Sequence, residues 1–158
     1  MNLERAPMSD LKLLALDDED LAVIAAHLQD AVLRVGDMAY LKAERRFAIV
    51  VNRFDWDHAV RSEGKTKRYI RRQTGVRIEH VEGAKVSGID LTDKDRVLSL
   101  LTLTFEAGEV PQGVVTLTFA GGGAVRLEVE CLEAALTDLG AAWSTRRKPE
   151  HAGDEPQR

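Results

Sequence analysis

Thr-Leu-Thr-Phe occurs twice in this chain, at Thr102–Phe105 and at Thr116–Phe119, and a third alternating segment follows at Val125–Cys131. Successive residues of a β-strand point to opposite faces, so each segment has one apolar face and one polar face. Three side chains form the apolar face of the first segment: Leu101, Leu103 and Phe105. The three segments together predict an antiparallel meander with one buried side, whose polar side carries only threonine, arginine and glutamate.

The length and composition of the chain are those of one globular domain. It has 158 residues, of which 44% are hydrophobic and 30% are charged, as is usual for a soluble protein. We expect the domain to span residues 10–143 and the polar residues 144–158 to form a disordered tail. Cys131 is the single cysteine, which suits a reducing cytoplasm. We see no signal peptide, and no apolar run is long enough to span a membrane.

A helix is predicted after Asp17, because a carboxylate at that position accepts backbone N–H bonds and favours the helix dipole. Leu21, Ile24 and Leu28 follow at helical spacing and form one buried stripe. A short second helix is predicted at Glu133–Gly140. Strands are predicted at Leu11–Leu16, Asp37–Leu41, Phe47–Phe54, Val76–Val81 and Ala84–Ile89, with little regular structure at Asp57–Gln73.

The predicted fold class is therefore α+β: a mostly antiparallel, curved sheet of about six to eight strands with an N-terminal helix and a short C-terminal helix. A barrel-like sheet capped by the C-terminal helix, similar in outline to pleckstrin-homology folds, is one specific form of this prediction. That likeness concerns shape and carries no function.

Seven short stretches form a fairly specific string of motifs: Asp20–Ile24, Leu28–Val32, Val35–Asp37, Asn52–Trp56, Leu98–Leu101, Phe119–Ala124 and Leu127–Cys131. The string resembles a bacterial family of small proteins described only as a domain of unknown function. The resemblance covers residues 10–147. It implies a bacterial, cytoplasmic, single-domain protein and transfers no activity.

Residues 61–77, here called the basic segment, hold seven basic residues and one acidic residue in a chain of net charge −4. Its bases are Arg61, Lys65, Lys67, Arg68, Arg71, Arg72 and Arg77, with Tyr69 among them. Such a set can neutralise phosphates while the aromatic ring stacks on a base. The alternatives are a solvated surface, an edge strand protected by charge, or a face that meets the acidic surface of a second copy.

Other motifs have an ordinary structural interpretation. Asp55–His58 offers two carboxylates and an imidazole, but no second cluster completes a metal site. Gly121–Gly123 leads into a strand and not into a helix, so it indicates a hairpin turn, not a phosphate loop. His27 lies on the flank of the first helix, without the partners that catalysis requires. Trp143 packs back on the terminal helix or is exposed as an anchor for a partner.

The sequence predicts no catalytic, cofactor or metal site. The leading hypothesis is a non-enzymatic module that binds another protein or itself, in the cytoplasm. The first alternative is a nucleic-acid or phosphate-ligand binder that uses the basic segment, and the second is an enzyme whose site residues are scattered in the sequence. The candidate anion or partner surface consists of Arg68, Arg71, Arg72, Arg77, Arg53, Trp56 and Trp143.

Overall fold

The computed structural model describes residues 11–54 and 69–145, with the backbone alone at residues 69–70 and 141–145. Ten strands in these ranges form one antiparallel sheet in the order β1-β10-β5-β4-β2-β7-β8-β9-β6, with β3 beside β4. The strands are β1 Lys12–Ala15, β2 Val32–Arg34, β3 Met38–Leu41, β4 Arg46–Phe54, β5 Tyr69–Ile78, β6 Val81–Ser87, β7 Val97–Ala107, β8 Gly113–Phe119, β9 Ala124–Val129 and β10 Ala134–Thr145. The prediction of a mostly antiparallel, curved sheet is confirmed.

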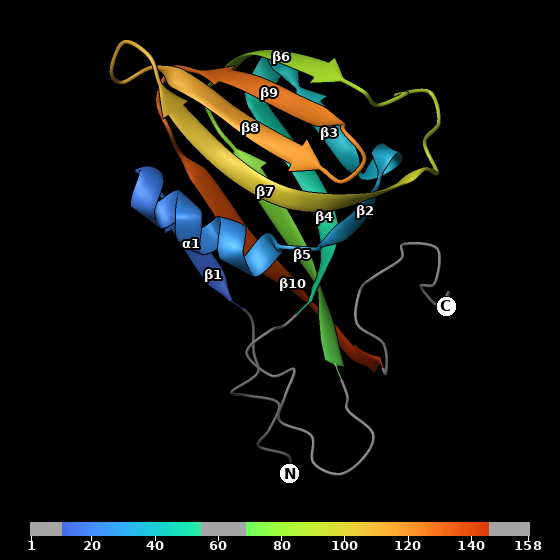
Figure 1. Ribbon diagram of the computed structural model, residues 1–158. Helices are drawn as coiled ribbons and strands as arrows, with labels where there is room; N and C mark the ends of the chain where they lie inside the picture. Colours follow the sequence, from blue (N-terminus) through green and yellow to red (C-terminus); the bar gives the residue numbers. More distant parts are fainter. Residues whose placement is uncertain (1–10, 55–68, 146–158) are drawn as a thin grey trace.

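The sheet bends into two halves that share one core. β7, β8, β9 and β6 lie across β4, β5 and β10 (Figure 1). Short β2 joins the halves, because Val32 pairs with Asn52 of β4 and with Ser99 of β7. Both inner faces contribute to a single apolar cluster, which includes Ile49 from one half and Leu117 from the other. We call β1, β10, β5, β4 and β3 the first half-sheet and β7, β8, β9 and β6 the second.

The two Thr-Leu-Thr-Phe segments pair with each other in the second half-sheet. Leu103 on β7 lies opposite Leu117 on β8, and each threonine lies opposite a threonine. The predicted meander is therefore confirmed, but the position predicted for Leu101 is wrong. A register shift between Leu100 and Thr102 reverses the alternation, so that Leu100 is buried and Leu101 is 46% exposed. A bulge of this kind moves the preceding side chains to the other face.

Helix α1, Asp18–Leu28, packs against β7 and β1. Asp17 caps its first turn, because the carboxylate accepts a hydrogen bond of 2.8 Å from the Asp20 amide. Leu21, Ile24 and Leu28 are the buried side chains of this helix, and they cover one open side of the bent sheet (Figure 1). Asp30 follows with a positive φ of 66° and turns the chain into β2.

The C-terminal helix predicted at Glu133–Gly140 is wrong, because this segment begins strand β10. Leucine and alanine favour a helix, but propensity is a weak prior that tertiary pairing overrides. Here the strand lies between β1 and β5 and pairs with both. Ala134 and Leu136 point into the core and are fully buried. β10 runs on to Thr145, so Ser144 and Thr145 belong to the sheet, while residues 146–158 lie outside the described ranges.

Strand β5 begins earlier than the sequence indicated. Tyr69–Gln73 was expected to lack regular structure, yet it pairs with β4 on one side and with β10 on the other. The turn between the predicted strands Val76–Val81 and Ala84–Ile89 is also displaced, since β5 ends at Ile78 and β6 begins at Val81. The connection is made by Glu79 and by His80, which has a φ of 60°.

Candidate functional site

The structure separates the predicted site residues along two strands. The register places Arg53 of β4 opposite Arg72 of β5, and Phe54 opposite Arg71. Arg77 lies at the other end of β5, opposite Ala135 of β10. Three other predicted residues lie outside the described side chains: Arg68, Trp56 and Trp143. The basic segment is thus a strand over part of its length.

Neighbouring arginines on β5 face opposite sides of the sheet. Arg72 shares the inner face with Thr74, whereas Arg71 and Arg77 point to the outer side because side chains alternate along a strand. Arg71 and Arg72 are each 4% exposed, while the Arg77 side chain is 48% exposed. The arginines of β5 therefore do not form one continuous basic surface.

A buried ion pair lies at the polar end of the inner face. Arg53 donates from Nε to Asp138 Oδ1 at 3.0 Å and from Nη2 to Asp138 Oδ2 at 2.9 Å. The Thr74 hydroxyl donates to Oδ1 at 2.7 Å, and the Leu11 amide donates to Oδ2 at 2.9 Å. The Arg53 and Asp138 side chains are only 4% and 2% exposed. Both carboxylate oxygens are therefore fully engaged.

The hydrogen bonds decide the charge state of this carboxyl group. Burial on its own would raise the pKa of Asp138, because an apolar environment disfavours the charged form. The bonds from Arg53, Thr74 and the Leu11 amide outweigh burial and hold the pKa of Asp138 below its ordinary value. Asp138 is thus an anion in the folded protein near neutral pH. It fixes Arg53 and ties the start of β1 to β10.

The geometry of the Arg53–Asp138 pair suits a role in stabilising the fold better than a role in catalysis. A bidentate arginine–carboxylate pair is a strong, directional contact. Its carboxylate has no oxygen left for a substrate proton, and the Asp138 amide also donates to the Leu11 carbonyl at 2.9 Å. Asp55 and Trp56, which follow Arg53 in the sequence, lie outside the described residues.

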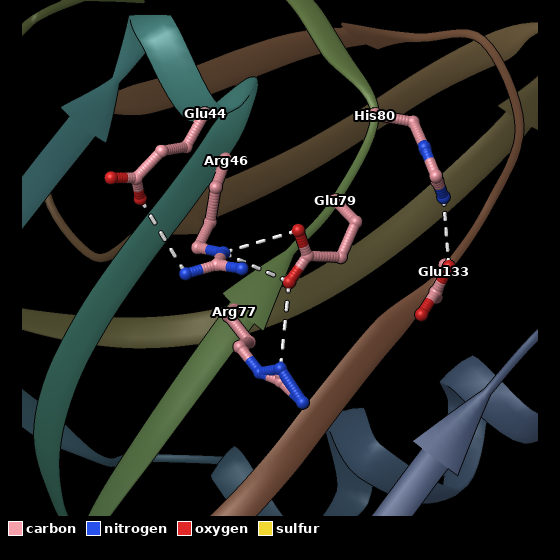
Figure 2. A network of polar contacts seen from close by, with 6 residues as sticks. All are labelled: Glu44, Arg46, Arg77, Glu79, His80 and Glu133. Carbon is pink, nitrogen blue, oxygen red and sulfur yellow. Dashed lines mark hydrogen bonds and ion pairs between the residues drawn. The ribbon is translucent and has the colours of Figure 1, made fainter.

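A second polar cluster surrounds the β5–β6 turn. Its members are Arg45, Arg46, Arg77, Glu79, His80, Glu130 and Glu133, here called the turn cluster. Arg46 donates from Nε to both oxygens of Glu79 at 3.1 and 3.0 Å, and Arg77 lies 3.4 Å from the same carboxylate. His80 Nε2 lies 2.8 Å from Glu133 Oε1. Figure 2 shows these side chains around the end of β5.

The turn cluster joins the two half-sheets where the chain crosses between them. The Glu79 amide donates to the Glu133 carbonyl, and the Glu130 amide donates to the His80 carbonyl. Arg45 pairs with Glu130 at 2.6 Å, and its hydrogen bond lowers the pKa of Glu130. Because each of these carboxylates already has a cationic or imidazole partner, the cluster presents little free charge to a ligand.

The outer face of the first half-sheet carries small and aliphatic side chains on either side of Arg77, and Thr137 and Lys12 also lie on it. We define it by Leu14, Ala48, Val50, Gly75, Ala135 and Leu139, which alternate with core residues along four strands. Leu14, Val50 and Leu139 are 56%, 36% and 49% exposed. A Cβ added at Gly75 would lie 3.7 Å from Leu139 Cδ2, so Leu139 extends across the glycine.

Metal and membrane sites are not visible in the described part of the chain. Among residues 11–54 and 69–145, no three His, Cys, Asp or Glu side chains are grouped closely enough to hold a metal ion. Asp55, Asp57 and His58 lie outside these ranges. No helix there has the length and apolar composition needed to cross a membrane. His27 is half-buried, and its Nδ1 lies 2.9 Å from the Val23 carbonyl oxygen.

Sequence reasoning missed Asp138, which binds Arg53, and Thr74, which donates to Asp138. Asp138 was hidden because its segment was expected to be helical, and Thr74 because the start of β5 was placed too late. No apolar–polar alternation signals a strand in this segment, because Ala135 and Leu139 are as apolar as Ala134 and Leu136.

These features define a predominantly antiparallel β-sheet protein whose buried and half-buried charges connect its strands. A family model described as "Protein of unknown function (DUF2948)" matches residues 11–151. The chain therefore belongs to this family, which confirms the resemblance to a domain of unknown function. No curated protein and no solved structure matches the chain.

Proposed function

We propose that this protein is a non-enzymatic interaction module that associates with a second copy of itself through the outer face of the first half-sheet. The observation that carries the proposal is the set of three half-exposed aliphatic side chains, Leu14, Val50 and Leu139, on the same side of the half-sheet. Contiguous apolar patches on a protein surface are a common sign of association.

The charges around this face favour a second copy as the partner. Arg77 lies on this face between Ala48 and Ala135, and Arg46 lies at the start of β4; both pair with Glu79. When two copies of this face come together, their arginines are already paired with Glu79. The two faces therefore repel each other little. Lys12 lies on β1, at the edge of this face, and is exposed. Within the described residues it forms no ion pair. A strongly charged partner would find no complementary field here.

The shape of the face also suits a symmetric dimer. Gly75, Ala48 and Ala135 lie on three adjacent strands, with Arg77 between the two alanines. Their small size leaves room around Arg77 for side chains of a second sheet. Face-to-face sheets pack about 10 Å apart with interdigitating side chains. A two-fold axis would set Val50 and Leu139 of each copy against the same face of the other.

The test is the mass of the protein in solution, measured by size-exclusion chromatography with light scattering over a range of concentrations. We expect the native chain to have twice the mass of one chain. Val50→Lys should shift it to monomer, since two lysines would then be buried in the interface. Leu101→Lys is the matched control, because Leu101 is similarly exposed on a strand of the other half-sheet. A monomeric native chain, or equal behaviour of the two variants, would refute the proposal.

The alternatives draw less support from the geometry. Phosphate binding by the basic segment needs accessible bases. Among its three bases with described side chains, Arg71 and Arg72 are each 4% exposed and Arg77 is half-exposed. An enzyme needs a site with free reactive groups, and Asp138 has none. A cytoplasmic location goes with our proposal, because one cysteine suits a reducing compartment. The pleckstrin-homology-like outline stays a prediction, and nothing in the proposal depends on it.

A further inference from the structure

A groove of about 420 Å³ lies where α1 begins, at a different part of the molecule from the outer face. Three connections meet there: the junction of β1 and α1, the β7–β8 loop and the β9–β10 loop. Figure 1 shows the start of α1 and the β7–β8 loop on the same side of the fold. The apolar lining comes from Leu16, Phe105, Val110, Pro111, Cys131 and Leu132.

The apolar walls of this groove are unusually accessible. Val110 is 82% exposed and Leu16 is 60% exposed, the two highest values among the large apolar side chains that the structure describes. Leu132 is only 6% exposed and belongs to the core cluster, so the groove continues into the apolar interior. Covering Val110 and Leu16 with another apolar group would remove their apolar surface from water, which favours binding in proportion to the area that is buried.

One rim of the groove is negatively charged. Asp17, Asp18 and Glu19 are consecutive, exposed and part of the lining. None of the three forms an ion pair within residues 11–54 and 69–145. The start of α1 stabilises them partly through its dipole, but a dipole end of about half a charge does not neutralise three carboxylates. The rim therefore attracts cations.

We propose that this groove binds a short segment of another protein that carries an aliphatic or aromatic side chain next to lysine or arginine. The apolar side chain enters between Val110 and Leu16, and the cation meets Asp18 and Glu19. Aliphatic walls beside unpaired carboxylates match this chemistry and exclude acidic segments, because like charges at an interface are repelled. The site is separate from the self-association face and does not depend on it.

The experiment begins with a selection of short random peptides displayed on phage against the immobilised full-length protein. We expect enriched sequences to combine Leu, Ile, Val or Phe with a neighbouring Lys or Arg. The most enriched peptide is then synthesised, labelled and titrated by fluorescence anisotropy. Its dissociation constant should rise about tenfold in Val110→Ser, the effect of losing one buried valine. Val86→Ser, which alters an exposed valine on β6, should bind like the native protein.

A second variant tests the charged rim. Asp18→Asn combined with Glu19→Gln should weaken binding and flatten its dependence on salt, since screening acts on the ion pairs. The monomerising Val50→Lys variant should bind the peptide as the native chain does, which separates this site from the self-association face. Enrichment of acidic or purely apolar peptides, or equal affinity of Val110→Ser and Val86→Ser, would overturn the proposal.

Discussion

Asp138 of β10 binds Arg53 of β4 across the intervening strand β5, with two hydrogen bonds of 3.0 and 2.9 Å. Thr74 lies on β5 between them and donates to the same carboxylate. One buried anion thus connects three adjacent strands by side chains, in addition to their backbone hydrogen bonds. It also receives the Leu11 amide at the start of β1, so four strands converge on one carboxylate.

Replacing Asp138 by Asn should destabilise the protein by about 3–5 kcal/mol, because the buried Arg53 guanidinium is left without its counter-charge. Urea unfolding followed by circular dichroism measures the free energy of unfolding. The control is the double variant Arg53→Met with Asp138→Leu, which removes both charges and should lose distinctly less. If Asp138→Asn unfolds at the same urea concentration as the native chain, the pair does not support the fold.

The same carboxylate should make stability depend on pH. The folded-state pKa of Asp138 is lowered, so the folded protein holds this proton less tightly than the unfolded chain does. Its contribution is then complete above the unfolded pKa of about 3.9 and is lost as the pH falls through the folded value. The difference in free energy of unfolding between native protein and Asp138→Asn should shrink on acidification below about pH 4.

Glu130 offers the control for this titration. Its pKa is lowered as well, through the hydrogen bond from Arg45, but the pair is exposed to solvent, with 47% and 44% of the two side chains accessible. Added salt should therefore abolish the contribution of Glu130, measured with Glu130→Gln, while that of Asp138 persists. Equal sensitivity to salt at both positions would contradict the burial of Asp138.

In the turn cluster, Glu79→Gln should cost about 1 kcal/mol of stability, between the value for a surface pair and that for a buried pair. Glu79 is 15% exposed and is the shared acceptor of Arg46 and Arg77. Glu44→Gln is the matched change, because Glu44 lies 3.6 Å from Arg46 and is 59% exposed. Chemical unfolding should show no loss for Glu44→Gln; a larger loss there than for Glu79→Gln would refute this assignment.

The sequence predicted the meander because its strands alternate strictly and turn at glycines. β7 and β8 pair where the repeated motif occurs, and the Gly121–Gly123 turn has the positive φ values of a tight hairpin, 90° and 102° at its first two residues. β10 was misread because Ala134–Leu139 is rich in helix formers, and its strand state depends on β1 and β5, which are distant in sequence. Local patterns do not contain such pairing.

The candidate surfaces were harder to predict from the sequence than the meander was. The sequence predicts Arg53, Arg71 and Arg72 to be surface cations, because arginine is rarely buried. Asp138, the partner of Arg53, lies 85 residues from it in the chain. The outer face needs the register of four strands before its small residues become neighbours. The groove at α1 is assembled from three loops, none of which carries a motif.

The last prediction concerns Gly113, which allows Phe105 to reach the groove. A Cβ at Gly113 would lie 2.5 Å from both Cε1 and Cζ of Phe105 and 2.7 Å from the Glu106 carbonyl oxygen. Gly113→Ala must therefore displace the ring or the strand, and overpacking of this kind costs about 1–3 kcal/mol. Thermal unfolding measures the loss.

Gly108→Ala is the control, because its nearest neighbour, the Gln112 carbonyl oxygen, lies at 3.8 Å, and its stability should stay near that of the native chain. Because Phe105 lines the groove, Gly113→Ala should also weaken binding of the selected peptide, whereas Gly108→Ala should not. If Gly113→Ala is as stable as Gly108→Ala, the Phe105 ring does not lie over this glycine, and the groove has a different wall.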